Sequence, residues 1–114
     1  MSERSDKVLL EDMLEAVDRI LEYTTGYSPE AFGKDKKTID AVLRNLQVLG
    51  EAAKQVSDVT KKANPEIEWS KIIRSRHVIV HEYFGVDLEI IWRIIQAHLT
   101  PVKIGLEQAL QNAQ

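Results

Sequence analysis

The chain has 114 residues, a formal net charge of −3 at pH 7 and no cysteine. A domain of this length can bury a core without disulfides, and a chain without thiols is natural in a reducing compartment. The mild negative charge argues against a general nucleic-acid coat protein but is compatible with a local basic cleft. No stretch has the apolar length of a membrane span, and the charged N-terminus is unlike a signal peptide. We therefore expect a cytoplasmic protein with no membrane contact.

Apolar residues recur at intervals of three and four along the chain, and glycine and proline are sparse, with five and three. This pattern predicts an all-α fold. The first helix is expected over residues 6–25, with Gly26 as its C-terminal cap. The loop over residues 26–37 contains Ser28–Glu30, where a proline follows a serine and a short turn of helix can start.

The second helix is predicted over residues 37–63, before Asn64 and Pro65 end it. Gly50 lies in its middle, where a glycine lowers helix stability by about 1 kcal/mol, so we expect it to permit close approach of another backbone. Glu51 follows and is interpreted as a polar residue on the flank of the apolar face.

The third helix is predicted over residues 69–84, and Gly85 ends it. Asp87 is the expected cap of the last helix, in which Pro101 predicts a kink. Four helices with short connections predict a single domain, residues 1–114, folded as an antiparallel four-helix bundle with a kinked last helix. The apolar faces are wider than one neighbour would cover, which favours a symmetric dimer.

The stretch from Trp69 to Asp87 combines an apolar helical segment with two arginines and two histidines: Arg74, Arg76, His77 and His81. Burying such groups without partners is costly, so we expect them to face a cleft or an interface. Histidine can transfer protons near neutral pH, and the guanidinium fork of arginine matches a phosphate. This combination suits cleavage at a phosphodiester, where the 2′-hydroxyl of RNA is an internal nucleophile and no metal is required.

Arg76 and His81 are five residues apart, about 140° around a helix, so they do not lie on one stripe. Arg76 can reach partway around the helix, or a two-fold axis can bring the same residues of a second chain into one cleft. His77 and His81 have the spacing of two metal ligands, but the sequence signals no third ligand, so we predict neither a metal nor a cofactor. His98 is interpreted as a packed or flanking histidine.

The run from Arg76 to Tyr83 resembles the signature of HEPN domains, in which arginine and a polar residue are followed by histidine. Arginine, four residues, histidine, one residue and tyrosine is the narrower pattern of HepT-like proteins, the partners of minimal nucleotidyltransferases. The surroundings agree along most of the chain: Arg44–Ala53 resembles the family's second-helix segment, and Pro65 with Trp69, Tyr83–Asp87 and Ile91-Trp92 resemble its later landmarks.

The resemblance implies a helical bundle that dimerises with the motif in an inter-subunit cleft. It implies a metal-independent endoribonuclease toxin of a type VII-like HEPN and nucleotidyltransferase toxin–antitoxin pair, acting on RNA such as tRNA or mRNA. By the same resemblance, Arg76 and His81 are the catalytic pair and His77 occupies the supporting polar position. Tyr83 is the acceptor of AMP, which the cognate nucleotidyltransferase antitoxin attaches to neutralise the toxin. Arg74 lies outside the motif and is expected to add to the basic cleft.

Two other interpretations use the same residues. In the first, the chain is a non-catalytic partner subunit of a nucleotidyltransferase, and the cleft binds nucleotide or substrate without cleaving it. In the second, it is a helical dimerisation domain whose polar residues only fix the register of the partners. Products that end in cyclic phosphate, formed with metal chelated, would distinguish cleavage from both.

Overall fold

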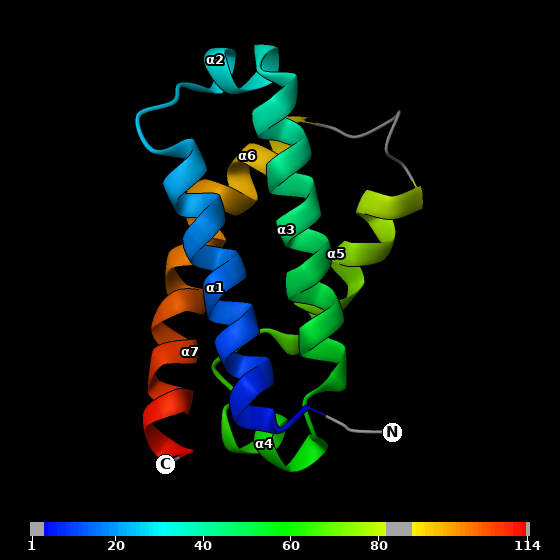
Figure 1. Ribbon diagram of the computed structural model, residues 1–114, viewed down its shortest axis with the longest axis vertical. Helices are drawn as coiled ribbons and strands as arrows, with labels where there is room; N and C mark the ends of the chain where they lie inside the picture. Colours follow the sequence, from blue (N-terminus) through cyan, green and yellow to red (C-terminus); the bar gives the residue numbers. More distant parts are fainter. Residues whose placement is uncertain (1–3, 82–87, 114) are drawn as a thin grey trace.

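The computed structural model describes residues 4–81 and 88–113, and of residues 77–81 it describes the backbone alone. The regular secondary structure of these residues is helical throughout, which confirms the all-α prediction (Figure 1). In chain order the helices are α1 (Asp6–Thr24), α2 (Pro29–Lys34), α3 (Lys36–Gln55), α4 (Asp58–Ala63), α5 (Trp69–His81), α6 (Leu88–Arg93), the π-helix η2 (Ile94–His98) and α7 (Leu99–Asn112).

The core lies where α1 packs against both α3 and α7, and α5 packs on the other side of α3 (Figure 1). Helix α1 buries side chains at the spacing of three and four that the sequence shows, and α3 and α7 present matching apolar faces. The largest fully buried side chains are Phe32, Leu10, Met13, Ile20, Leu46, Leu99, Leu106, Val17 and Val42. The four-helix topology and the symmetric dimer stay predictions.

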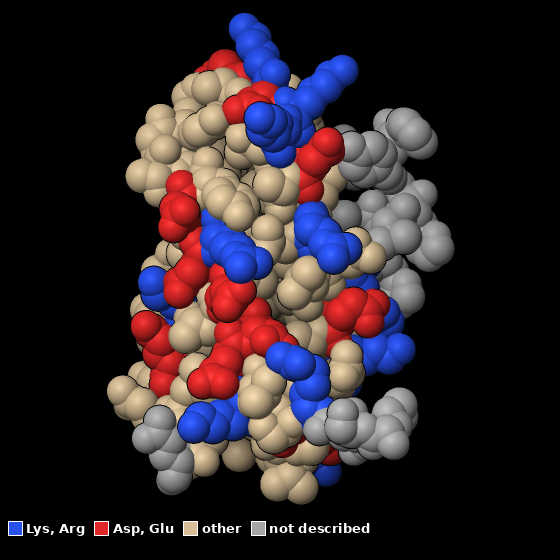
Figure 2. Space-filling view, viewed as in Figure 1, with Lys and Arg blue, Asp and Glu red and all other residues tan. Residues whose placement is uncertain are grey.

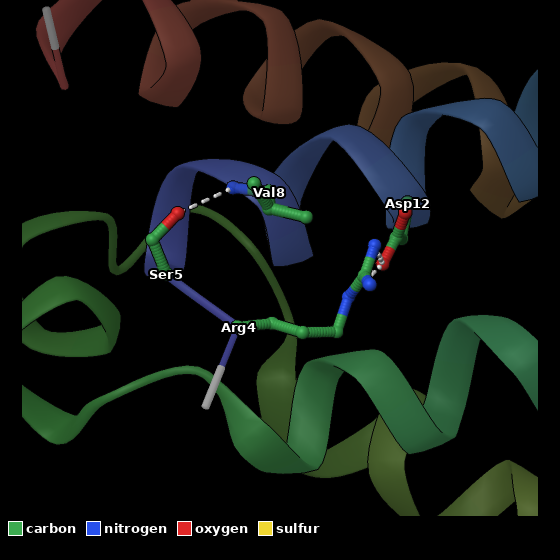
Figure 3. Close-up of polar contacts among 4 residues, drawn as sticks. All are labelled: Arg4, Ser5, Val8 and Asp12. Carbon is green, nitrogen blue, oxygen red and sulfur yellow. Dashed lines mark hydrogen bonds and ion pairs between the residues drawn. The ribbon is translucent and has the colours of Figure 1, made fainter. Parts of the chain in front are cut away.

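Helix α1 begins and ends as the sequence predicts. The hydroxyl of Ser5 accepts a hydrogen bond from the backbone N–H of Val8 at 3.2 Å and caps the N-terminus (Figure 3). Beside this cap, the Arg4 guanidinium donates to the Asp12 carboxylate, with Nε 2.9 Å from Oδ2. At the other end Gly26 has a φ of 80°, the left-handed conformation that glycine adopts without strain.

The prediction of a single helix over residues 37–63 is wrong, because the structure has two helices there, α3 and α4. The hydroxyl of Ser57 caps α4 by accepting from the backbone N–H of Thr60 at 3.3 Å. Asp6 of α1 then accepts hydrogen bonds from the Ser57 N–H at 3.1 Å and from the hydroxyls of Ser57 and Thr60, each at 2.5 Å. Together these contacts compensate the helical hydrogen bonds that are lost at the break.

The irregularity expected in the last helix lies upstream of Pro101. The chain widens into the π-helix η2, where the N–H of Leu99 donates to the carbonyl of Ile94, five residues earlier. Pro101 itself lies in the first turn of α7, which continues through it. The predicted end of the third helix at Phe84 and the Asp87 cap lie outside the described residues. None of the helices within residues 4–81 and 88–113 is long and apolar enough to cross a membrane.

Candidate functional site

Helix α5 carries the predicted site, and its first turn is firmly anchored. The indole N–H of Trp69 donates to the backbone carbonyl of Asn64 at 3.0 Å, and both residues are buried. One turn later Ile72 is 8% exposed and contributes to the core. An indole buried with its N–H satisfied fixes both the position and the direction of a helix start. Helix α5 therefore leaves the core in a defined direction toward Arg76.

Helices α5 and α3 approach each other closely at Gly50. A Cβ atom at this position would lie 2.9 Å from the Cβ of Arg76 and 3.1 Å from the backbone carbonyl oxygen of Ile72. The first distance is shorter than Cβ contacts in proteins and the second is tighter than most of them, so a Cβ would force α5 to shift and glycine permits the observed approach. The prediction that Gly50 allows another backbone to come close is confirmed, and the side chain that it admits is Arg76.

Arg76 forms an ion pair with Glu51, the residue after that glycine. The Nη1 atom of Arg76 donates to Oε1 of Glu51, across the interface between α5 and α3. The side chain of Arg76 is only 13% exposed, whereas that of Glu51 is 48% exposed. The guanidinium is thus held at the edge of the helix interface, with its carboxylate partner on the solvent side.

Of the predicted site residues, the structure shows a side-chain partner for Arg76, which pairs with Glu51. Arg74 is exposed on α5. The backbone of His77 and His81 belongs to α5, but their side chains lie outside the described residues, as does Tyr83. The assignment of His77, His81, Tyr83 and Arg74 to one cleft therefore stays a prediction.

Two depressions flank the ion pair and α5. A hollow of about 270 Å³ lies between α1 and α3, and Glu51 lines it together with Arg4, Asp12 and Arg44. On the opposite side of α5, a groove of about 190 Å³ separates α5 from η2 and α7. Its walls are apolar, and Glu68, Lys71 and His98 stand at its rim.

The rim of this groove carries its own charges. Lys71 pairs with Glu68 at 2.9 Å, and Nδ1 of His98 lies 3.8 Å from the same carboxylate. The hydrogen bond and positive charge of Lys71 lower the pKa of Glu68 below its ordinary value. His98 thus contacts a charged rim residue. Within the described part of the chain, no three potential metal-ligating side chains come together.

Charge is divided unevenly between the helices. Along α1 the exposed side chains are mainly acidic, and Figure 2 shows acidic side chains gathered over this helix. They include Glu11, Glu15, Asp18 and Glu22. Helix α5 instead carries Lys71, Arg74 and Arg76 and no acidic residue between Trp69 and His81. The first surface repels a polyanion, whereas on α5 Lys71 and Arg76 are paired with Glu68 and Glu51.

Glu51 is the site residue that the sequence did not single out. It was interpreted as a flanking polar residue, because a single glutamate beside an apolar face has no distinguishing pattern. Its neighbour Gly50 was the usable signal: a glycine in mid-helix indicates a close approach, and the residue next to it lies beside whatever approaches. The identity of that partner, Arg76, required the three-dimensional packing of α5.

The comparisons with known proteins agree with the motif. The family described as "Ribonuclease HepT-like" matches residues 13–109. A protein of Thermococcus cleftensis named "Probable ribonuclease HepT" is 40% identical over 92% of this chain and 96% of its own length. A "Putative RNase" of Methanocaldococcus jannaschii is 37% identical over 83% of this chain and 78% of its own. Another, from Caldanaerobacter subterraneus, is 30% identical over 96% and 97%. No solved structure matches the chain.

Proposed function

Because the chain belongs to the HepT-like ribonuclease family, we propose that it is a metal-independent endoribonuclease that acts as the toxin of a toxin–antitoxin pair. The observation that carries this proposal is the placement of Arg76. It is a permanent cation, 13% exposed, held at the edge of the contact between α5 and α3. A guanidinium in a fixed, partly desolvated position stabilises phosphate charge better than one on a mobile exposed side chain.

The proposed reaction is transesterification within RNA. His81 removes the proton of the 2′-hydroxyl, the 2′-oxygen forms a bond to phosphorus, and the bond from phosphorus to the 5′-oxygen breaks. The 5′-oxygen leaves with a proton from a protonated histidine, for which a second copy of His81 in a dimer cleft is the candidate. Arg76 stabilises the negative charge that develops on the phosphoryl oxygens. The products are a 2′,3′-cyclic phosphate and a 5′-hydroxyl.

The remaining predicted residues have supporting roles in this proposal. His77 is the polar neighbour of the catalytic pair, and Arg74, which is exposed, attracts the RNA backbone. The acidic surface of α1 favours approach of RNA from the side of α5. Tyr83 is the proposed regulatory position: its phenolic oxygen attacks the α-phosphate of ATP on the cognate nucleotidyltransferase, and pyrophosphate leaves. The attached AMP adds bulk and negative charge close to the catalytic residues.

The test is cleavage of a mixed RNA pool by purified protein with EDTA present. We expect products that end in cyclic phosphate, and we expect Arg76→Ala and His81→Ala to lower the rate by about 100-fold or more. Circular dichroism and light scattering check that both variants remain folded dimers. Cleavage by His81→Ala at the wild-type rate contradicts the catalytic assignment. Intact RNA together with nucleotide binding would instead support the non-catalytic partner subunit.

Modification is tested in a parallel reaction. The protein is incubated with ATP, magnesium and the cognate nucleotidyltransferase, and peptides are analysed by mass spectrometry. We expect the mass of AMP on Tyr83 and loss of RNA cleavage in the same sample. Equal labelling of the Tyr83→Phe variant contradicts the tyrosine as acceptor, without affecting the assignment of Arg76 and His81.

A further inference from the structure

We propose that Glu51 is a positioning residue for RNA cleavage: it orients the guanidinium of Arg76, and Gly50 sets the distance at which it does so. This inference rests on the proposed function, because it gives Glu51 a role through Arg76. Glu51 itself is not assigned a contact with the reacting atoms. Gly50 and Glu51 are adjacent on α3, and both face Arg76 of α5.

The first half of this arrangement is steric. With no Cβ at Gly50, the Cβ of Arg76 lies against the backbone of α3, and the carbonyl of Ile72 lies beside the same position. A methyl group there would meet the carbonyl oxygen at 3.1 Å, and a backbone group of α5 cannot move aside without moving the helix. Gly50 therefore fixes how far Arg76 stands from α3.

The second half is electrostatic. An arginine side chain has several rotatable bonds, and holding it in one orientation requires a partner. The carboxylate of Glu51 accepts a hydrogen bond from Nη1 of Arg76. A guanidinium has five N–H donors in one plane, so it can hold a carboxylate with one nitrogen and a phosphate with another. A contact at one end thus orients the plane that a substrate phosphate would meet.

The surroundings of Glu51 make this role specific. Its side chain is 48% exposed and lines the hollow between α1 and α3, so the carboxylate does not contribute to the core. Two other cations line that hollow: Arg4, which is paired with Asp12, and Arg44. The pair is half exposed only on the side of Glu51, and a carboxylate that is screened by water contributes little to folding stability. The consequence of losing Glu51 should therefore appear in catalysis more than in stability.

The expected kinetic signature separates positioning from binding. Glu51→Gln removes a negative charge beside Arg76, so RNA binding should become equal or tighter. The same change weakens the constraint on the guanidinium, and misplacement of a catalytic group by about 1 Å can cost on the order of 100-fold. We expect kcat to fall about 10-fold or more while the Kd for an uncleavable 2′-deoxy substrate does not rise. Glu107→Gln, at an exposed glutamate on α7, is the control and should change neither.

A pair of glycines tests the steric half. A Cβ at Gly50 would meet Arg76 and Ile72, whereas a Cβ at Gly105 would lie 2.8 Å from Cγ1 of Ile67. Both glycines are buried close approaches, but only the first adjoins Arg76. Gly50→Ala should lower kcat about 10-fold or more, and Gly105→Ala should leave kcat within two-fold. Equal kinetic effects at both positions would show that α3 acts through overall stability, and would overturn the proposal.

Nuclear magnetic resonance provides a readout independent of RNA. The ¹H–¹⁵N resonance of the Arg76 guanidinium, assigned by its loss in Arg76→Lys, should move in Glu51→Gln and stay in place in Glu107→Gln. An unchanged resonance in Glu51→Gln, or kcat within two-fold of wild type, overturns the positioning role. If Arg76→Ala cleaves RNA at the wild-type rate, the proposed function fails instead, and the resonance still reports whether the contact exists.

Discussion

The carboxylates of Asp6 and Glu51 each join two helices, but their partners differ. Asp6 of α1 accepts from the N–H and the hydroxyl of Ser57 and from the hydroxyl of Thr60, at distances of 2.5–3.1 Å. All three donors are neutral. Glu51 of α3 pairs with a cation, the guanidinium of Arg76 on α5. The Asp6 contact joins α1 to the start of α4, and the Glu51 contact holds Arg76, a residue with a predicted function.

This difference indicates where each contact should be detected. The hydrogen bonds to Asp6 stabilise the folded state and lower the pKa of its carboxyl group, with Ser57 making the largest contribution. Their donors have no proposed role in the reaction. In the ion pair of Glu51 the carboxylate is half exposed, and its screening by water reduces its contribution to stability. Loss of the Asp6 contacts should therefore change unfolding, and loss of the Glu51 contact should change cleavage.

The largest effect is expected from exchanging the charges of the Glu51 pair. The double variant Glu51→Arg with Arg76→Glu can restore an ion pair between α3 and α5, so it should fold. It places a carboxylate where the phosphate needs a cation, and RNA cleavage should fall by about 100-fold or more. Initial rates on the same RNA, with circular dichroism as the folding check, measure this. Cleavage near the wild-type rate would mean that the pair is only structural, like the contacts of Asp6.

A smaller effect, on stability alone, is expected from Ser57→Ala. This change removes the cap of α4 and one hydrogen bond to Asp6, and loss of a helix cap costs about 1 kcal/mol. Urea unfolding should show the loss, while the rate of RNA cleavage stays within two-fold. Ser70→Ala, at an exposed serine of α5, is the matched control. A fall in the cleavage rate of Ser57→Ala would contradict the view that the Asp6 contacts affect stability alone.

The smallest effect is the pH dependence of the Asp6 contacts. The pKa of this carboxyl is lowered in the folded state, so its contribution to stability is present at neutral pH. The contribution is lost as the pH falls below the ordinary carboxyl range and through the lowered value. The difference in Tm between wild type and Asp6→Asn should therefore be largest near pH 7 and shrink toward about pH 3. A difference that is constant between these pH values would contradict the assignment.

Local patterns predicted the parts of the fold that local interactions determine. The spacing of apolar residues placed α1, and the serine–proline pair placed the start of α2. The glycine in mid-helix predicted the close approach at Gly50. The break between α3 and α4 was missed, although the apolar pattern ends at Val56, because Asp6, the partner of the capping residue Ser57, is 51 residues away. The π-helix was missed because Pro101 marked the irregular region but not the turn that accommodates it.

The candidate site shows the same division. Arg76 was identified from its place beside histidines in an apolar stretch and from the resemblance that the motif carries. Glu51 was not, since its role comes from the packing of α5 on α3, and its own segment gave only the signal of the neighbouring Gly50. Residues that do chemistry leave a pattern in the sequence, whereas residues that orient them are identified only when the helices are placed together.

The two tryptophans give the molecule separate optical reporters. Trp69 is 8% exposed and its indole donates to a carbonyl at the start of the helix that carries Arg76. Trp92 lies on α6, with its ring centroid 5.3 Å from that of Phe32 on α2. In a Trp92→Phe variant, the remaining fluorescence would report on the anchoring of α5 alone. In Trp69→Phe, it would report on whether α2 stays docked against α6. Loosening of α5 and loosening of the contact between α2 and α6 can therefore each be followed by the emission of one tryptophan.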